Sequence, residues 1–374
     1  MLSAFNRDGT VSHITVIAEA GVNHNGSLSM ALDLVDAAAE TGADFVKFQT
    51  FRADEEISQN APKADYQMES TNVKESQLEM VRKLELGLEA HEKIIARCHE
   101  KNLAFLSSPF DIPSIFLLVQ QLGLSTLKIP SGEITHAPYL FEAAKTGCQL
   151  ILSTGMSTLD DIQEALSIIA LGLARSDQKP TIEAAHAAFS SPKGQAALLE
   201  KVSLLHCTTE YPAPIEDVNL RAMDTLHESF GLPVGYSDHT QGISVAIASA
   251  ARGAQIIEKH FTLDRSLPGP DHKASLEPAE LSEMIIGIRD IEHALGSAIK
   301  QPAPTELKNM AIARKSLVAK VQIKAGQKFS ERTIAVKRPG TGISPMNYWQ
   351  IMGTTSNRDY SLDELIDESE LGNE

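Results

Sequence analysis

Residues 14–51 read ITVIAEAGVNHNGSLSMALDLVDAAAETGADFVKFQTF, and this stretch holds the pattern that decides the fold. A β-branched, apolar run over residues 14–21 ends in polar and glycine residues, and a second such run begins at Phe45. Between them, Ser27–Thr41 opens with a residue type that caps helix N-termini and then repeats Ala and Leu at spacings of three and four. Strand, helix and strand in this order predict a parallel βαβ unit.

The same unit recurs along most of the chain. We expect strands at Ile14–Gly21, Phe45–Phe51, Ala104–Phe110, Leu127–Gly132, Leu150–Gly155, Val202–Thr208, Val234–Thr240 and Ala254–Thr262. Strands alternating with helices in this number fit an α/β fold of the (β/α)8 TIM-barrel type, which typically takes ~250 residues. A doubly wound sheet fits less well, because GVNHNG at residues 21–26 does not match the GxGxxG fingerprint. An insertion at Arg52–Gln77 looks polar and irregular and follows a strand end, where the active-site loops of barrels lie.

A second region follows the barrel, which we place at residues 1–298. Residues 299–313 contain Pro302 and Pro304 and are predicted to be a linker, and residues 314–374 are predicted to form a small β-rich domain. Such a short region is small for an independent core, so we expect it to pack on the barrel or on a second subunit.

Composition restricts the function. Of the 374 residues, 43% are apolar and 22% are charged, as is usual for a globular protein, and the formal charge is −16. A chain this acidic is a poor candidate for binding nucleic acid or an anionic membrane, so we expect neither as a partner. The three cysteines are scattered without a CxxC pair, no secretory signal is evident, and no apolar run is long enough to span a membrane. These features predict a cytoplasmic protein without a zinc–cysteine site.

Polar residues close the expected strands, and in a TIM barrel this edge carries the active site. Lys47 and Gln49 are two residues apart and so share one face of their strand. The other polar residues at or near the expected strand ends include Glu19, Ser108, Lys128, Ser131, Glu133, Ser153, Ser237, His239 and His260. Some others, such as Asp238 and Lys259, can equally pair outside the barrel. The pattern as a whole predicts a barrel-top enzyme.

Two sets of residues carry chemistry. His239 and His260 close neighbouring strands and suit a divalent metal with open positions, although two hydrogen-bonded core histidines are an equal alternative. His206 ranks behind them as a ligand. Lys47 and Lys128, beside small hydroxyl residues, suit a phosphate or carboxylate; the alternative is a buried pair of a lysine with Glu19 or Glu133.

Segments along the whole chain resemble the N-acetylneuraminate (sialic acid) synthase family. The matching stretches, in family order, are IAEAGVNHNG (17–26), FVKFQTF (45–51), APKADYQ (61–67), SQLEMVRKLEL (76–86), LKIPSGE (127–133), ILSTGM (151–156), LHCTTEYPAP (205–214), GYSDHT (235–240), EKHFTLDRSLPGPDH (258–272) and VKRPGTGISPMNY (336–348). The C-terminal region resembles the antifreeze-like (SAF) domain that these synthases carry.

The resemblance implies condensation of phosphoenolpyruvate with open-chain N-acetylmannosamine and water, giving N-acetylneuraminate and phosphate by C–O cleavage, with Mn²⁺ or Mg²⁺ as cofactor. It implies that His239 and His260 hold the metal. It places Lys47, Lys128, Ser108, Ser131, Ser153 and Ser237 around phosphoenolpyruvate, Glu19 near the reacting carbonyl, and Gln49, Glu133, Tyr211 and Asp271 on the sugar side. Arg338 matches an arginine that reaches into the partner subunit's site, which implies a domain-swapped homodimer.

The match has departures that bear on the substrate. Thr209 stands where some members have Asn, Ser108 stands where some have Thr, and Met68–Lys74 falls in the variable loop over the sugar. We therefore expect an N-acetylneuraminate synthase first. The alternative is a related nonulosonic acid synthase, such as one that uses 2,4-diacetamido-2,4,6-trideoxymannose for legionaminic acid. A non-catalytic carbohydrate-binding barrel ranks last, because binding alone does not require Glu19, both lysines and both histidines.

Overall fold

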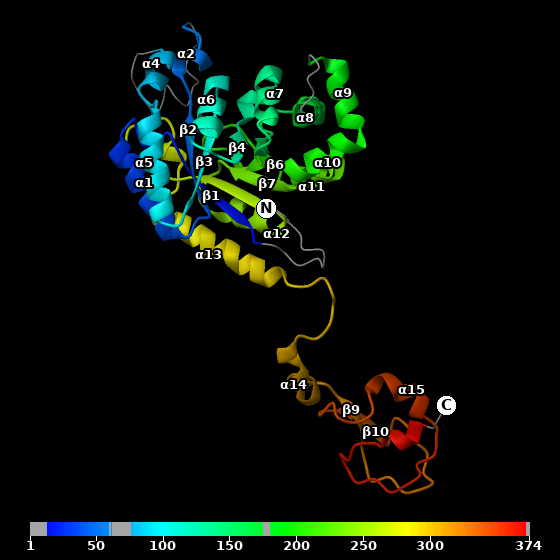
Figure 1. The fold of residues 1–374 in the computed structure, drawn as a ribbon. Coiled ribbons are helices and arrows are strands. Elements are labelled where there is room, and N and C mark those ends of the chain that lie inside the picture. Colours follow the sequence, from blue (N-terminus) through cyan, green and yellow to red (C-terminus); the bar gives the residue numbers. More distant parts are fainter. Residues whose placement is uncertain (1–12, 60, 62–75, 175–179, 372–374) are drawn as a thin grey trace. The chain divides into compact units, whose positions relative to one another are not determined.

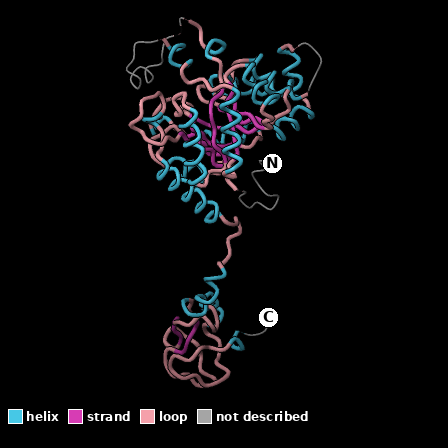
Figure 2. Tube along the Cα trace, turned by 60° about the vertical axis from the view of Figure 1, so that its left-hand side comes forward, coloured by secondary structure: helices cyan, strands magenta, loops and turns pink. Residues whose placement is uncertain are grey.

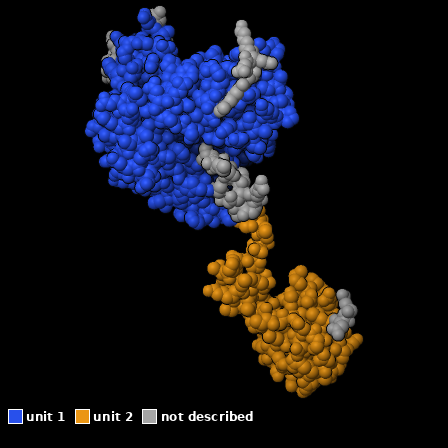
Figure 3. Space-filling view, in the orientation of Figure 1, with its two compact units in different colours: residues 1–296 blue, residues 297–374 orange. Residues whose placement is uncertain are grey.

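The computed structural model describes residues 13–59, 61, 76–174 and 180–371. The chain divides into two compact units, residues 1–296 and residues 297–374, which are coloured separately in Figure 3. Each unit is described by itself below.

Unit 1 is the predicted (β/α)8 barrel. Its parallel strands are β1 (Thr15–Gly21), β2 (Phe45–Thr50), β3 (Ala104–Pro109), β4 (Thr126–Ile129), β5 (Gln149–Ser153), β6 (Val202–Cys207), β7 (Val234–Asp238) and β8 (Ile256–His260) (Figure 1). Hydrogen bonds join them in the order β3-β2-β1-β8-β7-β6-β5-β4, so β1 pairs with β8 and the sheet curls back on itself. Every expected strand is present, with ends that differ by a few residues.

Helices cover the outside of the strands, as Figure 2 shows in cyan around magenta. Those described in unit 1 are α1 (Leu28–Thr41), α2 (Ala53–Glu56), α4 (Gln77–Arg82), α5 (Leu88–Glu100), α6 (Ile112–Phe116), α7 (Ala137–Lys145), α8 (Leu159–Leu173), α9 (Ile182–Ser190), α10 (Pro192–Lys201), α11 (Ala222–Phe230), α12 (Ser244–Ala251) and α13 (Pro278–Leu295). The insertion expected to be irregular thus contains α2. It also holds Gln77, the first residue of α4, whereas residues 60 and 62–75, which include Met68–Lys74, lie outside the described residues.

Helix α1 illustrates how the sequence pattern produces an element. The Ser27 side chain accepts a hydrogen bond from the Met30 N–H and so caps the first turn. Gly42, at φ 83°, ends the helix in the left-handed conformation that glycine adopts without strain. The apolar residues at spacings of three and four, such as Leu34 and Ala38, are buried against the barrel.

The barrel interior is apolar only at one level. Ile17, Leu106, Ile151, Leu205 and Ile256 form a buried cluster inside the strands, separate from the larger core that lies beneath the helices. Further toward the carboxyl ends, the inward positions are polar. The register aligns Glu19 with both Lys47 and His260 across three adjacent strands. The barrel interior therefore has an apolar layer and, toward the carboxyl ends of the strands, a polar layer.

Unit 2 contains β9 (Ser316–Ala319) and β10 (Ile334–Lys337), which pair antiparallel, together with the short helix α15 (Tyr348–Ile351). Contrary to the expectation from its size, it has its own buried core, which includes Leu317, Phe329 and Tyr360. The predicted linker is also more ordered than expected, because its second half forms helix α14 (Pro304–Ala313). Among the described residues, no helix is long and apolar enough to cross a membrane.

Candidate active site

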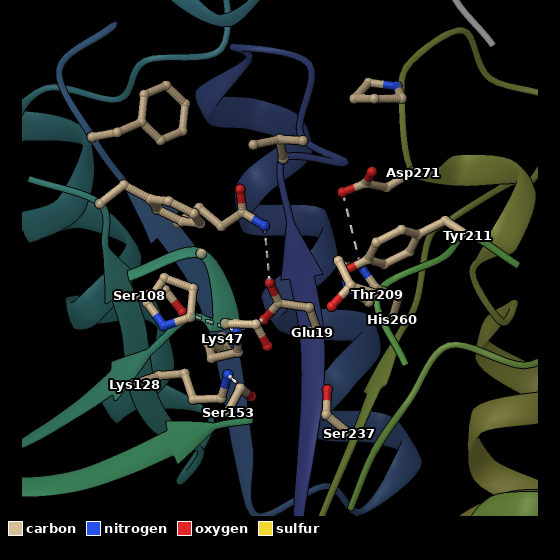
Figure 4. Close-up of a pocket in the computed structure, with 18 of the residues that line it drawn as sticks. Glu19, Lys47, Ser108, Lys128, Ser153, Thr209, Tyr211, Ser237, His260 and Asp271 are labelled. Atoms are coloured by element: carbon tan, nitrogen blue, oxygen red, sulfur yellow. Dashed lines mark hydrogen bonds and ion pairs between the residues drawn. The ribbon is translucent and has the colours of Figure 1, made fainter. Parts of the chain in front are cut away.

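One cavity of about 470 Å³ opens at the carboxyl ends of the barrel strands. All the predicted site residues except Glu133 and Arg338 line it. Figure 4 labels several of them, among them Glu19, Lys47 and His260. They come from every strand or from the loop that follows it, so the topology alone gathers residues that are far apart in sequence. Arg338 belongs to unit 2, where its guanidinium donates to the Ala313 carbonyl oxygen at 3.1 Å.

The floor of the cavity is a cluster of buried charges. Lys47 Nζ lies 2.8 Å from a Glu19 carboxylate oxygen and 3.4 Å from Glu258. Lys128 Nζ lies 3.5 Å from the other oxygen of Glu258. All four side chains are at most 4% exposed, so solvent screens their interactions little. Lys47 therefore forms the buried Lys–Glu pair that was the alternative to anion binding. The pair nevertheless lines the cavity, so both interpretations hold for this lysine.

Hydroxyl groups complete the floor. Lys47 donates to Ser108 Oγ at 3.0 Å, and Lys128 donates to Ser153 Oγ at 2.7 Å. The hydroxyl of Ser237 donates to Glu258 at 2.8 Å. Thr209 Oγ1 is buried and has no hydrogen-bond partner among the described residues. The floor therefore presents cations and hydroxyls together, which is the donor set that binds phosphate and carboxylate oxygens.

Glu258 is a site residue that the sequence analysis did not select. Burial alone would raise the pKa of its carboxyl, but Lys128 and Lys47 outweigh that effect and lower the pKa to about 2. It is the anion that pairs with both buried lysines. The sequence could have identified Glu258, because it lies two residues before His260 on one strand, so both side chains must face the same side.

Glu19 differs from Glu258 although both contact Lys47. Burial raises the pKa of Glu19 to about 7, against the attraction of Lys47, and the negative charge of Glu258 adds to the rise. For Lys47, burial favours the neutral amine, but the two carboxylates outweigh it and raise the pKa above its ordinary value. Glu19 is thus poised to gain or lose a proton near neutral pH, beside a lysine that stays charged.

The two predicted histidines face each other inside the cavity. Their ring centroids are 5.6 Å apart, and Tyr211 lies against both rings. Burial lowers the pKa of His239 to about 4 and lowers that of His260 as well, so both imidazoles are neutral at neutral pH. His239 Nδ1 donates to the Thr208 carbonyl oxygen at 2.6 Å, which leaves the Nε2 lone pair unprotonated.

A polar ring surrounds the space above Glu19. Gln49 donates to Glu19 at 3.4 Å, and Asp271 lies 3.9 Å from His260 Nδ1. A Cβ placed on Gly21 would come within 3.6 Å of Glu19, Gln49 and Asp271 together, so these three side chains converge on one point. Burial raises the pKa of Asp271 to about 6. These side chains can donate hydrogen bonds to the hydroxyls of a substrate and accept hydrogen bonds from them.

An apolar surface bounds the cavity on the side of β1, β2 and β3. Val22, Phe51, Val81, Leu84 and Phe110 pack against one another and all line the cavity; we call this cluster the apolar wall. Phe51 and Phe110 meet edge to face at 6.3 Å. Sequence periodicity gave no indication of this surface, because its members come from separate loops and a short helix.

Three side chains considered in the sequence analysis do not line the cavity. His206 donates Nε2–H to the Val218 carbonyl oxygen at 2.6 Å and does not line the cavity, so it is not a third ligand there. Glu133 pairs with His136 at 2.6 Å and is not among the lining residues. Lys259 pairs with Asp238 at 2.8 Å on the outer face of the strands, as the structural alternative for these residues proposed.

The raised pKa of Glu19 predicts a pH-dependent loss of stability. The folded protein holds this proton more tightly than the unfolded chain, so the stabilisation is complete below pH 4.5 and is lost as pH rises through about 7. Glu19→Gln mimics the protonated form. Between pH 5 and pH 8, its free energy of unfolding should fall less than that of the wild type, by an amount on the order of 3 kcal/mol.

Denaturant unfolding of both proteins at the two pH values measures the difference. Glu216→Gln, which removes an exposed carboxylate outside the cavity, is the control and should follow the wild type. Parallel pH profiles for Glu19→Gln and the wild type would contradict the assignment.

Comparisons with known proteins agree with this architecture. A model of the NeuB family matches residues 34–300, and a model of the SAF domain matches residues 314–371. The N,N'-diacetyllegionaminic acid synthase of Campylobacter jejuni is 50% identical over 353 residues, which is 94% of this chain and 98% of that protein. The protein of the same name from Legionella pneumophila is 43% identical, over 91% of this chain and 89% of that protein.

A solved structure extends the comparison. The N-acetylneuraminic acid (sialic acid) synthetase of Leptospira borgpetersenii aligns with a TM-score of 0.66 at 32% identity, over 80% of this chain and 90% of that one. The family model covers most of unit 1 and the relatives are matched over nearly their whole length. The chain therefore belongs to the NeuB family of carbon–carbon bond-forming transferases, with a TIM barrel followed by a SAF domain.

Proposed function

We propose that this enzyme condenses phosphoenolpyruvate with 2,4-diacetamido-2,4,6-trideoxymannose and water to give N,N'-diacetyllegionaminic acid and phosphate. The observation that carries the choice of sugar is the 50% identity, over nearly the full length of both chains, to a relative named for that product. The Legionella relative at 43% supports the same choice. This proposal replaces N-acetylmannosamine, which the sequence motifs favoured first.

The floor of the cavity is suited to phosphoenolpyruvate. In a chain with a formal charge of −16, Lys47 and Lys128 are each only 3% exposed and point at the same carboxylate. Both have hydroxyl groups within hydrogen-bond distance. A ligand with one phosphate and one carboxylate can use both cations at once. The unpartnered Thr209 hydroxyl adds one more donor to the set.

The histidine pair fits a divalent metal. Both imidazoles are neutral. His239 Nε2 carries no proton and lies 3.4 Å from the Ser237 hydroxyl, and the buried His260 Nδ1 has no hydrogen-bond partner among the described residues. No group of three or more His, Cys, Asp or Glu among these residues converges on a metal position. We therefore propose that His239 and His260 hold Mn²⁺ or Mg²⁺, with oxygen ligands from the substrate or water. Such an ion acts as a Lewis acid toward a carbonyl oxygen.

The residues then divide the work of the reaction. Lys47, Lys128 and the hydroxyls fix phosphoenolpyruvate so that its C3 faces C1 of the open-chain sugar, and this orientation supplies much of the rate enhancement. The bond from C3 to C1 leaves positive character at C2, where water adds. The tetrahedral intermediate collapses by breaking its C–O bond to phosphate, while the lysines stabilise the charge on the departing group. Glu19, with a pKa of about 7, either gives a proton to the forming hydroxyl or holds that hydroxyl in place.

The second candidate is N-acetylneuraminate synthesis, which uses the same chemistry on N-acetylmannosamine. The Leptospira structure, at 32% identity, supports this reading at a lower level of similarity. Purified protein with Mn²⁺ and phosphoenolpyruvate should release phosphate at least tenfold faster, in kcat/KM, with the diacetamido sugar than with N-acetylmannosamine. A preference for N-acetylmannosamine would contradict the first proposal. Label in the bridging oxygen of phosphoenolpyruvate should leave with phosphate, because the C–O bond breaks.

The metal proposal has a test that does not depend on turnover. Chelator-treated wild type should bind about one Mn²⁺ per chain in calorimetry, whereas His239→Ala and His260→Ala should each weaken binding by at least tenfold. His206→Ala is the matched control, because this half-buried histidine donates to a backbone carbonyl oxygen away from the cavity. Equal Mn²⁺ affinity in all four proteins would rule out the assigned ligands.

We also propose that the enzyme is a domain-swapped homodimer in which Arg338 of one subunit completes the site of the other. Arg338→Ala should lower kcat/KM by about tenfold or more, since the loss of one cation at a binding site costs roughly this much. Co-expression of Arg338→Ala with His260→Ala should restore close to one quarter of wild-type activity. Half of the dimers are then mixed, and each mixed dimer holds one intact site. No gain above the two parents would show that Arg338 does not act across subunits.

A further inference from the structure

The apolar wall bounds a cavity whose floor is charged and hydrogen-bonding, and whose lining also includes the apolar residues Ile57, Met80 and Met156. Val22, Phe51 and Leu84 are 5–8% exposed, and together with Val81 and Phe110 they form one packed cluster along the cavity. These five side chains have no hydrogen-bonding groups. A substrate hydroxyl placed against them would lose its water partners and gain none, which costs affinity.

The position of the chemistry decides which part of the substrate meets this wall. The reacting carbon must lie near Glu19, the lysines and the histidines, because these residues carry the proton, the cations and the proposed metal. Gln49 and Asp271 lie beside Glu19, further from the floor, and can form hydrogen bonds with substrate hydroxyls. The wall is therefore left for the end of the sugar that does not react.

We propose that the apolar wall is the subsite for the C6 methyl and the C4 acetamido methyl of the sugar, and that it selects 6-deoxy sugars over their 6-hydroxy counterparts. The inference rests on the proposed function and extends it to the residues that select the sugar. The two candidate sugars differ at these two positions, where N-acetylmannosamine has hydroxyls. Gln77 lines the cavity four residues before Val81 on α4, so both lie on one helix face, and its amide suits the acetamido group.

The sharpest probe changes one substituent only. We expect wild-type kcat/KM to be at least tenfold higher for 6-deoxy-N-acetylmannosamine than for N-acetylmannosamine, since one apolar group in an apolar pocket is worth about 10- to 200-fold. Val81→Thr adds a hydroxyl at constant shape and should reduce that ratio by about tenfold. Phe110→Tyr, which keeps the ring, should reduce it in the same direction. The KM for phosphoenolpyruvate should stay within twofold of the wild-type value.

Val119→Thr is the matched control, because Val119 is partly buried in a helical segment away from the cavity. It should leave the ratio unchanged. A wild-type ratio near one, or ratios that stay at the wild-type value in both wall variants with unaltered melting temperatures, would overturn the inference. The proposed function fails separately, if the wild type uses N-acetylmannosamine in preference to the diacetamido sugar. In that case, the ratio of kcat/KM for the 6-deoxy sugar to kcat/KM for the 6-hydroxy sugar still tests whether the apolar wall contacts C6.

Discussion

The contact of Glu258 with both Lys47 and Lys128 is the interaction on which the site depends. Two buried ammonium groups facing one cavity would repel each other and would each lose hydration. Glu258 offsets both effects, and its own hydrogen bond from Ser237 fixes the carboxylate. Removing one member of such a cluster leaves an uncompensated buried charge, which typically costs about 3–5 kcal/mol. The cations that an anionic substrate needs are therefore held in place before the substrate arrives.

The same cluster explains why two nearby carboxylates behave differently. Glu258 contacts two lysines and stays ionised. Glu19 contacts one lysine, and the negative charge of Glu258 disfavours its ionised form. Their pKa values are about 2 and about 7. Under the proposed roles, environments that push the pKa values of two carboxyl groups apart in this way separate a permanent counter-ion from a proton carrier. The barrel provides this separation with residues on neighbouring strands, β1 and β8.

Side-chain alternation explains what the sequence could and could not predict. The TIM barrel and most of the site were predictable, because apolar strands with polar carboxyl ends recur and alternate residues face inward. Alternation also places Glu258 with His260 and excludes His206, whose neighbours Leu205 and Cys207 face the interior. The place of Glu133 outside the cavity lining was not predictable, because it follows the strand, within the short helical turn Ser131–Glu133, where alternation no longer applies. The core of unit 2 was not predicted because size alone argued against it.

The apolar wall was unpredictable for a different reason, and that reason bears on how this fold changes its substrate. Its members come from the loop after β1, the ends of β2 and β3, and helix α4 with the turn that follows it. No periodic pattern connects these segments, so only the folded chain brings them together. The charged floor, in contrast, is built from side chains on the strands themselves, whose positions the hydrogen-bonded register fixes. Under the proposed assignment of the wall as a sugar subsite, substitutions there would alter which sugar fits without moving the lysines, the histidines or Glu19. Under that assignment, the barrel would keep one reaction, and the segments over β1 to β3 would decide which molecule undergoes it.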